Sequence, residues 1–144
     1  AGGLARLDWA LADDPDAVIL ELGANDGLRG LDPQATYDNL DAILARLTGQ
    51  ERLPVLIAGM LAPPNLGREY GEAFNAVFPR LAKKYDAPFY PFFLEGVAME
   101  PALNQSDGIH PNAAGVAEIV KRIKPHVVRL LESRDLAGRQ DAGN

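Results

Sequence analysis

The sequence of 144 residues contains no cysteine, and this absence excludes a thiol nucleophile, a disulfide framework and a thiolate metal site. Only two histidines are present; they lie far apart in sequence with no tight carboxylate cluster, so we expect no metal and no cofactor. Basic residues are also few. The 14 Lys and Arg face 20 Asp and Glu, and a net charge of −6 without a basic cluster argues against a nucleic-acid partner.

Long apolar runs are missing as well. No run approaches the roughly 20 residues of a membrane span, and no signal peptide is present, which carries no weight if the front of the chain has been removed. The phosphate-binding pattern G-x-x-x-x-G-K-[ST] is absent too. What remains, 47% hydrophobic and 24% charged residues, is typical of one globular domain with a substantial core.

Short apolar runs alternate with stretches of helical periodicity. Strands are predicted at 17–22, 53–60 and 87–93, and helices at 4–12, 33–47, 68–85 and 112–131, with Pro79 bending or splitting one helix. The first run is typical of a strand buried on both faces of a parallel sheet, whereas Pro88 and Pro91 favour an edge position for the third. A spacing of roughly 35 residues suits right-handed βαβ units.

The predicted fold class is therefore α/β, a three-layer αβα sandwich around a parallel sheet. Residues 1–131 would form the domain, and 132–144 a flexible polar tail. In such sheets the ligand site lies beyond the carboxyl ends of the strands. Asn25 follows the first strand and His110 precedes the last helix, so we expect folding to bring these two side chains near each other.

Asp107 and His110 lie three residues apart in the stretch SDGIHPN. A carboxylate that accepts the Nδ1 proton of an imidazole leaves Nε2 free to take a proton from a nucleophile. Alternatively, Asp107 simply makes a turn and His110 starts the last helix. The D-x-x-H pattern alone does not choose between these interpretations.

Gly23, Asn25 and Asp26 form the pattern G-x-N-D directly after the first strand. An asparagine amide at a strand end can donate to a developing oxyanion, and removing one such donor typically costs about 3 kcal/mol of barrier. Glycine would let the chain turn there and bring the amide close. The alternative is a plain Asn-Asp-Gly turn.

Together, G-x-N-D and a D-G-x-H-P stretch about eighty residues later resemble the SGNH (GDSL-type) hydrolases. More narrowly, the sequence is similar to the bacterial arylesterase, thioesterase and lysophospholipase branch. The resemblance is carried by ELGANDGLRGLDP, GREYGEAF, PFYPFFLEGV and SDGIHPN, and it covers nearly the whole chain. It implies a flavodoxin-like sandwich and a Ser-His-Asp triad.

The resemblance also implies a role for particular residues. Asp107 and His110 would complete the triad, and Asn25 would be an oxyanion donor. Gly23 and Asp26 would support the loop that carries Asn25. Residues 27–31 match a segment that moves on substrate binding, and the implied acyl-site residues are Leu28, Pro63 and Ile109.

One departure from the family is large. The family begins with a strand ending in G-D-S, whose serine is the nucleophile, and a second block supplies a glycine N–H; both blocks are absent here. Ser106 adjoins Asp107 and Ser133 lies in the tail, so neither follows a strand. We therefore expect a fragment without its N-terminal strands, or a chain completed by an N-terminal segment or second polypeptide, with an exposed sheet edge.

Three hypotheses follow. The first is a serine ester hydrolase acting on small-molecule esters or acyl thioesters, without a cofactor; GLRG after G-x-N-D favours the thioesterase-like branch. The second is an inactive remnant that needs a complementing segment, and the third is a carbohydrate O-acetylesterase. Relatives of this branch are often exported, so we expect a periplasmic or secreted protein.

Overall fold

The computed structural model describes the backbone of residues 1–141 and the side chains of residues 1–133. Its main elements are α1 (Gly2–Ala5), α2 (Leu7–Ala10), β1 (Val18–Leu20), α3 (Ala24–Leu28), α4 (Pro33–Ala45), β2 (Val55–Ala58), α5 (Arg68–Asn75), α6 (Val77–Tyr85), β3 (Phe89–Tyr90) and α7 (Ala113–Asp141). Three shorter turns complete them: a π-helical turn η1 (Arg46–Gln50) and the 3₁₀ turns η2 (Pro64–Leu66) and η3 (Pro101–Leu103).

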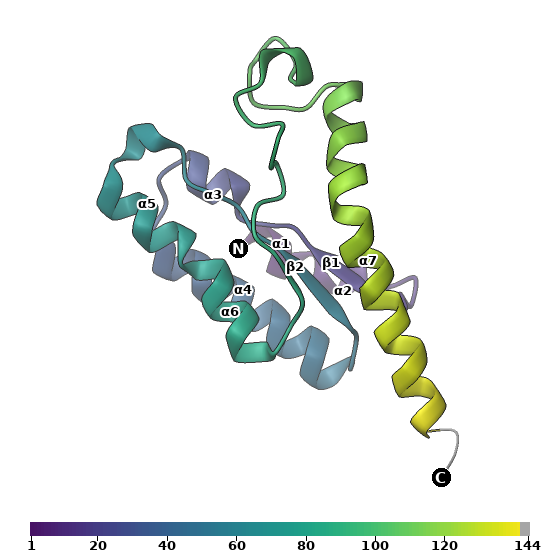
Figure 1. Cartoon of the computed structure of the whole chain (residues 1–144). Coiled ribbons are helices and arrows are strands. Elements are labelled where there is room, and N and C mark those ends of the chain that lie inside the picture. The colour runs from purple at the N-terminus through teal and green to yellow at the C-terminus, as the bar shows by residue number, and fades with distance from the viewer. Residues whose placement is uncertain (142–144) are drawn as a thin grey trace.

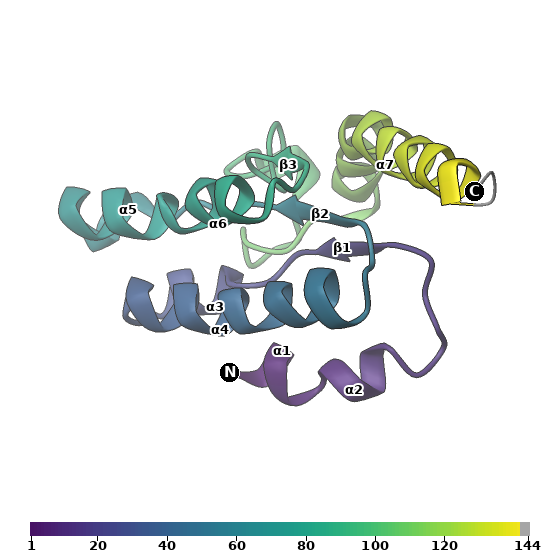
Figure 2. The ribbon, with the colours of Figure 1, turned by 90° about the horizontal axis from the view of Figure 1, so that it is seen from below.

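The three strands form one parallel sheet in the order β1-β2-β3. Helices α4, α5 and α6 lie on one side of it and α7 lies on the other, as Figures 1 and 2 show. The predicted α/β sandwich with a parallel sheet is confirmed. Strand β3 is the edge strand that Pro88 and Pro91 predicted, and it has only two residues.

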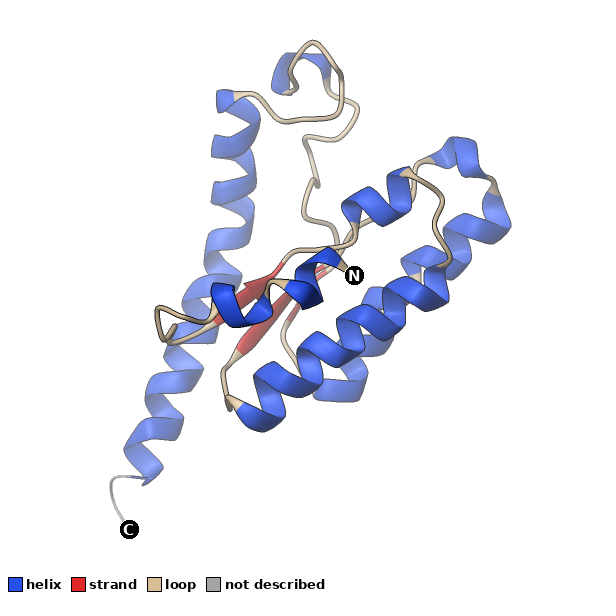
Figure 3. Ribbon diagram, turned by 180° about the vertical axis from the view of Figure 1, so that it is seen from behind, coloured by secondary structure: helices blue, strands red, loops and turns tan. Residues whose placement is uncertain are grey.

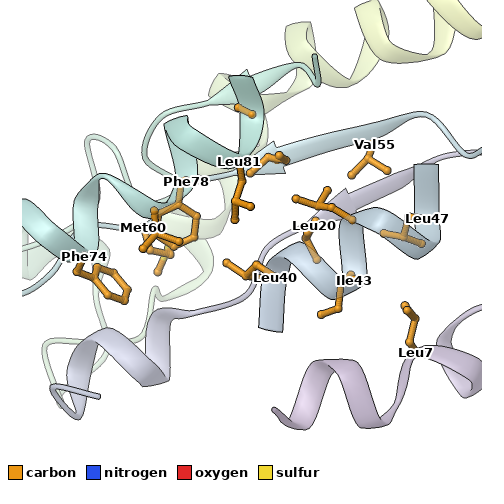
Figure 4. Packing of buried hydrophobic residues seen from close by; sticks show 14 residues of the cluster. Leu7, Leu20, Leu40, Ile43, Leu47, Val55, Met60, Phe74, Phe78 and Leu81 are labelled. Carbon is orange, nitrogen blue, oxygen red and sulfur yellow. The ribbon is translucent and has the colours of Figure 1, made fainter. Parts of the chain in front are cut away.

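The larger core fills the space between the sheet and helices α4 and α6 (Figure 4). Strand β2 alternates its side chains between the two faces, so Ile57 enters this core while Leu56 faces α7. All four β2 residues are buried, as an apolar run at the centre of a sheet should be. Figure 3 shows β1 and β2 crossing between the two helical layers.

Strand β1 corrects one prediction, because it is not buried on both faces. Ile19 pairs with Leu56 in the β1–β2 register, so the two side chains share the α7 face. Leu56 is fully covered, yet Ile19 is 45% exposed. Helix α7 lies beside β2 and β3 (Figure 2), and within the described residues β1 has no strand on its outer edge.

Several helix boundaries also differ from those predicted. The helix expected at 4–12 is two short helices, and the loop expected at 23–27 contains α3. The long helix 68–85 does split, into α5 and α6 at Ala76, three residues before Pro79. Proline is tolerated in the first turn of α6, where a backbone N–H would have no helical partner.

The last helix is longer than predicted. Helix α7 continues past residue 131 to Asp141, where the sequence predicted a tail from 132. Residues 142–144 lie outside the described residues, and the flexibility of the segment after 131 stays a prediction. None of the helices in the described part of the chain combines the length and apolar character that crossing a bilayer requires.

Candidate functional site

The first half of the candidate site is α3, which starts directly beyond β1. Gly23 has a φ of 108°, a left-handed conformation that favours glycine. A Cβ there would also lie 3.1 Å from the ring of Phe78. Gly23 therefore lets the chain leave the strand and turn tightly over the core, which places Asn25 in the single turn of α3.

Side chains from α4 and α5, distant in sequence, contact α3 and hold it in place. Gly27 is buried, and a Cβ added to it would lie 2.8 Å from the ring of Phe74. Thr36 of α4 donates a hydrogen bond from Oγ1 to the Asp26 carboxylate at 3.3 Å. Tyr70 of α5 donates to the carbonyl of Leu31 at 2.9 Å. The loop-supporting role of Gly23 and Asp26 in a catalytic site stays a prediction.

The Asn25 side chain is exposed and makes no hydrogen bond to any described residue. Its amide is therefore free to donate to a ligand. It lines an open cleft of about 550 Å³ between α1, α3 and α4, together with Glu21. Burial raises the pKa of the Glu21 carboxyl above its ordinary value.

The second half is the loop that precedes α7. Nδ1 of His110 lies 2.7 Å from Oδ2 of Asp107, and the backbone N–H groups of Ile109 and His110 donate to Oδ1 at 2.9 and 3.0 Å. The His110 backbone bond, then its imidazole and the Ile109 bond, hold the pKa of Asp107 well below its usual range. The carboxylate is therefore ionised near neutral pH.

The His110 side chain is 70% exposed, and its Nε2 makes no hydrogen bond to any described residue. An Nδ1–H that donates to Asp107 leaves Nε2 as an unprotonated acceptor facing solvent. This geometry is that of the orienting half of a triad. It is also compatible with the turn interpretation, because the Asp107 carboxylate caps the backbone of the same turn.

The structure does not bring the two halves together. Both lie on the side of the sheet where the strands end, but no hydrogen bond or ion pair among the described residues joins Asn25 to Asp107 or His110. In Figures 1 and 3 the loop before α7 stands at the top of that helix, apart from α3. The expected approach of Asn25 to His110 is therefore absent from this arrangement.

The implied acyl-site residues are distributed over both halves. Leu28 ends α3 and is 46% exposed, while Ile109 lies in the second loop and is 48% exposed. Pro63 lies just before η2 and is half-buried. Exposed apolar side chains at these positions suit an apolar ligand, but nothing in their placement assigns one.

Sequence reasoning missed the supporting roles of Phe74, Tyr70 and Asn112. Helical periodicity over residues 68–85 places the two aromatic residues on the inward face of the predicted helix, but it does not indicate that they contact the segment beyond β1. Asn112 precedes a periodic apolar run, which is a helix N-cap signal. Its Oδ1 accepts hydrogen bonds from the N–H groups of Ala114 and Gly115.

Fold and site together define an α/β protein with an Asp-oriented imidazole and a free amide at the ends of the strands. Residues 1–117 match the GDSL-like lipase/acylhydrolase family model. The chain belongs to this family.

Named relatives agree with this assignment. The chain is 49% identical over 111 residues to thioesterase 1/protease 1/lysophospholipase L1 of Escherichia coli, a match that covers 76% of the chain and 53% of the relative. It is 42% identical over 132 residues to esterase TesA of Pseudomonas aeruginosa, covering 91% and 65%. A crystal structure of the esterase EstA from Pseudoalteromonas sp., inhibited by monoethylphosphonate, superimposes with a TM-score of 0.83 at 30% identity, covering 91% of the chain and 72% of that protein. The chain thus spans about half the length of the Escherichia coli relative.

Proposed function

We propose that this chain is the body of a serine ester hydrolase whose base is His110. Asp107 holds the imidazole by its Nδ1–H, and Nε2 takes the proton of a serine as that serine attacks an acyl carbonyl. The Asn25 amide donates to the oxyanion of the tetrahedral intermediate, and water then releases the acid. The observation that carries the proposal is the 2.7 Å contact between Nδ1 of His110 and Asp107, with the ring exposed to solvent.

The reaction requires Asn25 and His110 to face the same carbonyl group. Because the two are apart in this structure, the proposal requires the loop of residues 104–112 to approach α3 in the active arrangement. A loop on the long connection between β3 and α7 can make such an approach without breaking the sheet. The substrate classes that we propose, esters and acyl thioesters, are those named for the relatives.

The nucleophile is proposed to come from a complementing segment, either in the same polypeptide or in a second one. Of the two serines, Ser106 precedes Asp107 and Ser133 lies within α7, where its Oγ donates to the carbonyl of Leu130, so neither follows a strand. The exposed part of the sheet supports such a segment, because among the described residues β1 has no strand on its outer edge and Ile19 is exposed beside it. A strand paired to this edge, followed by a helix over Ile19, would cover both.

Helix α7 also carries exposed apolar side chains. His126 contacts the ring of Tyr90 in β3, so that side of α7 faces β3. Val116 and Val120, in the first turns of α7, are 50% and 54% exposed. We propose that these valines and Ile19 pack against the complementing segment, since exposed apolar side chains of this size favour burial.

Activity is tested by p-nitrophenyl ester hydrolysis with the 144-residue chain and with the chain preceded by its upstream genomic sequence. We expect hydrolysis, and labelling by a fluorophosphonate, in the extended protein alone. His110→Ala should abolish hydrolysis, whereas His126→Ala, the matched change at the other histidine, should leave most of it. Activity that survives His110→Ala would overturn the proposal, and labelling at Ser106 would overturn the assignment of the nucleophile.

The inactive remnant and the carbohydrate O-acetylesterase remain as outcomes of the same assay. An extended protein that hydrolyses neither oxygen esters nor acyl thioesters indicates the remnant. One that releases acetate from acetylated sugars and ignores longer acyl chains indicates the O-acetylesterase. A periplasmic or secreted location is proposed from the resemblance alone, and fractionation of the producing cells tests it.

A further inference from the structure

The loop that carries Asp107 and His110 is closed at its base by two asparagines. Asn104 and Pro111 form an antiparallel bridge, and the N–H of Gln105 donates to the carbonyl of His110 at 2.7 Å. The Asn104 side chain is 8% exposed and donates to the carbonyls of Val97 and Glu100. The incoming end of the loop is therefore anchored in the turn that precedes it.

Asn112 ties this anchored end to the start of α7. Its Oδ1 accepts from the N–H groups of Ala114 and Gly115 at 3.0 and 3.1 Å, so the side chain caps the helix. Its Nδ2 donates to the carbonyls of Ala102 and Asn104 at 2.9 and 3.2 Å. One carboxamide thus holds the helix with its oxygen and the opposite side of the loop with its nitrogen.

Backbone contacts also hold the incoming end of the loop close to the first turn of α7. The N–H of Asn112 donates to the carbonyl of Leu103 at 2.9 Å. Gly115 allows that carbonyl to lie against the first turn of α7, since a Cβ there would collide with it. The His110 side chain is 70% exposed, so neighbouring side chains cover little of its ring and its contact with Asp107 depends on the shape of the loop.

We propose that Asn112 is a positioning residue for His110, because its amide nitrogen closes the loop that sets the imidazole against Asp107. The importance of this role rests on the proposed function, in which His110 is the base. The contacts themselves do not, so the inference can be tested without any ester being hydrolysed.

The test uses the two histidines of the chain as reporters in proton–nitrogen NMR. At a pH high enough that the spectrum itself shows neither ring to carry a second proton, the nitrogen shifts give the tautomer of each ring. In the unmodified chain we expect His110 to be predominantly the Nδ1–H tautomer that Asp107 accepts. His126, packed on Tyr90 within α7, is the internal control for the helix.

Two variants separate the functions of the carboxamide. Asn112→Ser keeps a side-chain oxygen that can cap α7 but is too short to reach the carbonyls of Ala102 and Asn104. We expect it to lower the Nδ1–H share of His110 by at least half and to leave the His126 signals in place. Asn112→Ala should do the same to His110, with some loss of helicity. Asp32→Ala removes the matching cap of α4, where Asp32 accepts from Gln34, and should leave His110 unchanged.

Each other result overturns the proposal. If Asn112→Ser retains the tautomer of the unmodified chain, the amide nitrogen positions nothing. If His126 shifts together with His110, Asn112 supports α7 as a whole, and if Asp32→Ala alters His110 as well, the effect is general. A wild-type His110 in the Nε2–H tautomer contradicts the Asp107 pairing and with it the proposed function, which distinguishes that failure from the failure of Asn112 alone.

Discussion

The two halves of the candidate site are held by different kinds of contact. Around Asn25 the support is long-range: Tyr70 reaches a carbonyl 39 residues earlier in the chain, and Phe74 lies under Gly27. Around His110 the hydrogen bonds of the described residues are local, within residues 97–115. The Asn25 half is therefore part of the folded core, whereas the His110 half is a self-contained loop.

This difference predicts how each half responds to mutation. A change in the core should disturb α3 and leave the Asp107–His110 pair intact. A change in the loop should do the reverse. Substitutions in each half can therefore test whether the two are independent.

Phe74→Ala should produce the largest effect. Phe74 is fully buried, and its ring packs on Tyr70 and against the edge of Phe78. Its loss should lower the free energy of unfolding by about 3–5 kcal/mol, measured by urea denaturation followed by circular dichroism. The Asn25 amide signals should shift in NMR spectra, while the His110 tautomer should not. Leu47→Ala, a deletion elsewhere in the same core, should destabilise the fold without moving Asn25. A His110 tautomer that changes in Phe74→Ala would show that the two halves are coupled.

Gly27→Ala should cost less, about 1–3 kcal/mol, because the new methyl group would lie 2.8 Å from the Phe74 ring and must push it aside. Gly71→Ala is the matched control. Gly71 is in α5 with no atom within 4 Å of an added Cβ, so alanine should stabilise the helix by roughly 0.5–1 kcal/mol. If both substitutions changed the free energy of unfolding by the same amount, the Phe74 ring would not be packed closely against Gly27 in solution.

The same contrast explains which parts of the site the sequence could predict. The pairing of Asp107 with His110 was predictable, because three residues of spacing bring the two side chains together within one turn. The support of α3 by Phe74 was not, since helical periodicity marks a side chain as inward without naming what it meets. The separation of Asn25 from His110 was equally inaccessible, because the expectation came from the topology of parallel sheets, which fixes a common edge but no distance.

The fold shows the same limit in β1 and α7. The run around Ile19 predicted a strand correctly, but hydrophobicity does not reveal whether a neighbouring helix covers it. In α7 the polar residues after 131 were interpreted as a tail. Most of them are strong helix formers, and a single glycine such as Gly138 costs only about 1 kcal/mol, so the helix continues to Asp141.

Tyr70→Phe should have a smaller effect on stability, about 0.5–1.5 kcal/mol. The substitution removes the hydroxyl that donates to Leu31 and leaves the ring on Phe74. Hydrogen exchange should quicken in the segment of residues 27–31, because this bond ties it to α5. Tyr37→Phe is the control: its ring contacts the Arg80 guanidinium and should keep that contact, so the expected change is below about 0.5 kcal/mol. Unchanged exchange at residues 27–31 in Tyr70→Phe would remove Tyr70 from the support of α3.

The smallest effect on the fold, and the sharpest on the loop, concerns the titration of Asp107. Its folded pKa is depressed, so the contacts of this carboxylate are complete above the unfolded value of about 3.9 and are lost as the pH falls through the lower folded value. Carbon NMR of the side-chain carboxyl should therefore show Asp107 still ionised at about pH 3. His110→Ala should raise the pKa only part of the way, because the backbone N–H groups of residues 109 and 110 remain as donors.

That partial response separates the two interpretations of the loop. If His110→Ala restored an ordinary aspartate pKa, the imidazole alone would hold the carboxylate and the turn would contribute nothing. If it left the pKa unchanged, the backbone N–H groups of the turn alone would stabilise the Asp107 carboxylate. The imidazole would then contribute nothing, and Asp107 would not orient it. An intermediate pKa of Asp107 means that the backbone of the turn fixes the position of the carboxylate and that the carboxylate then orients the imidazole. Because all these groups are exposed and local, Phe74→Ala should leave the titration of Asp107 unchanged.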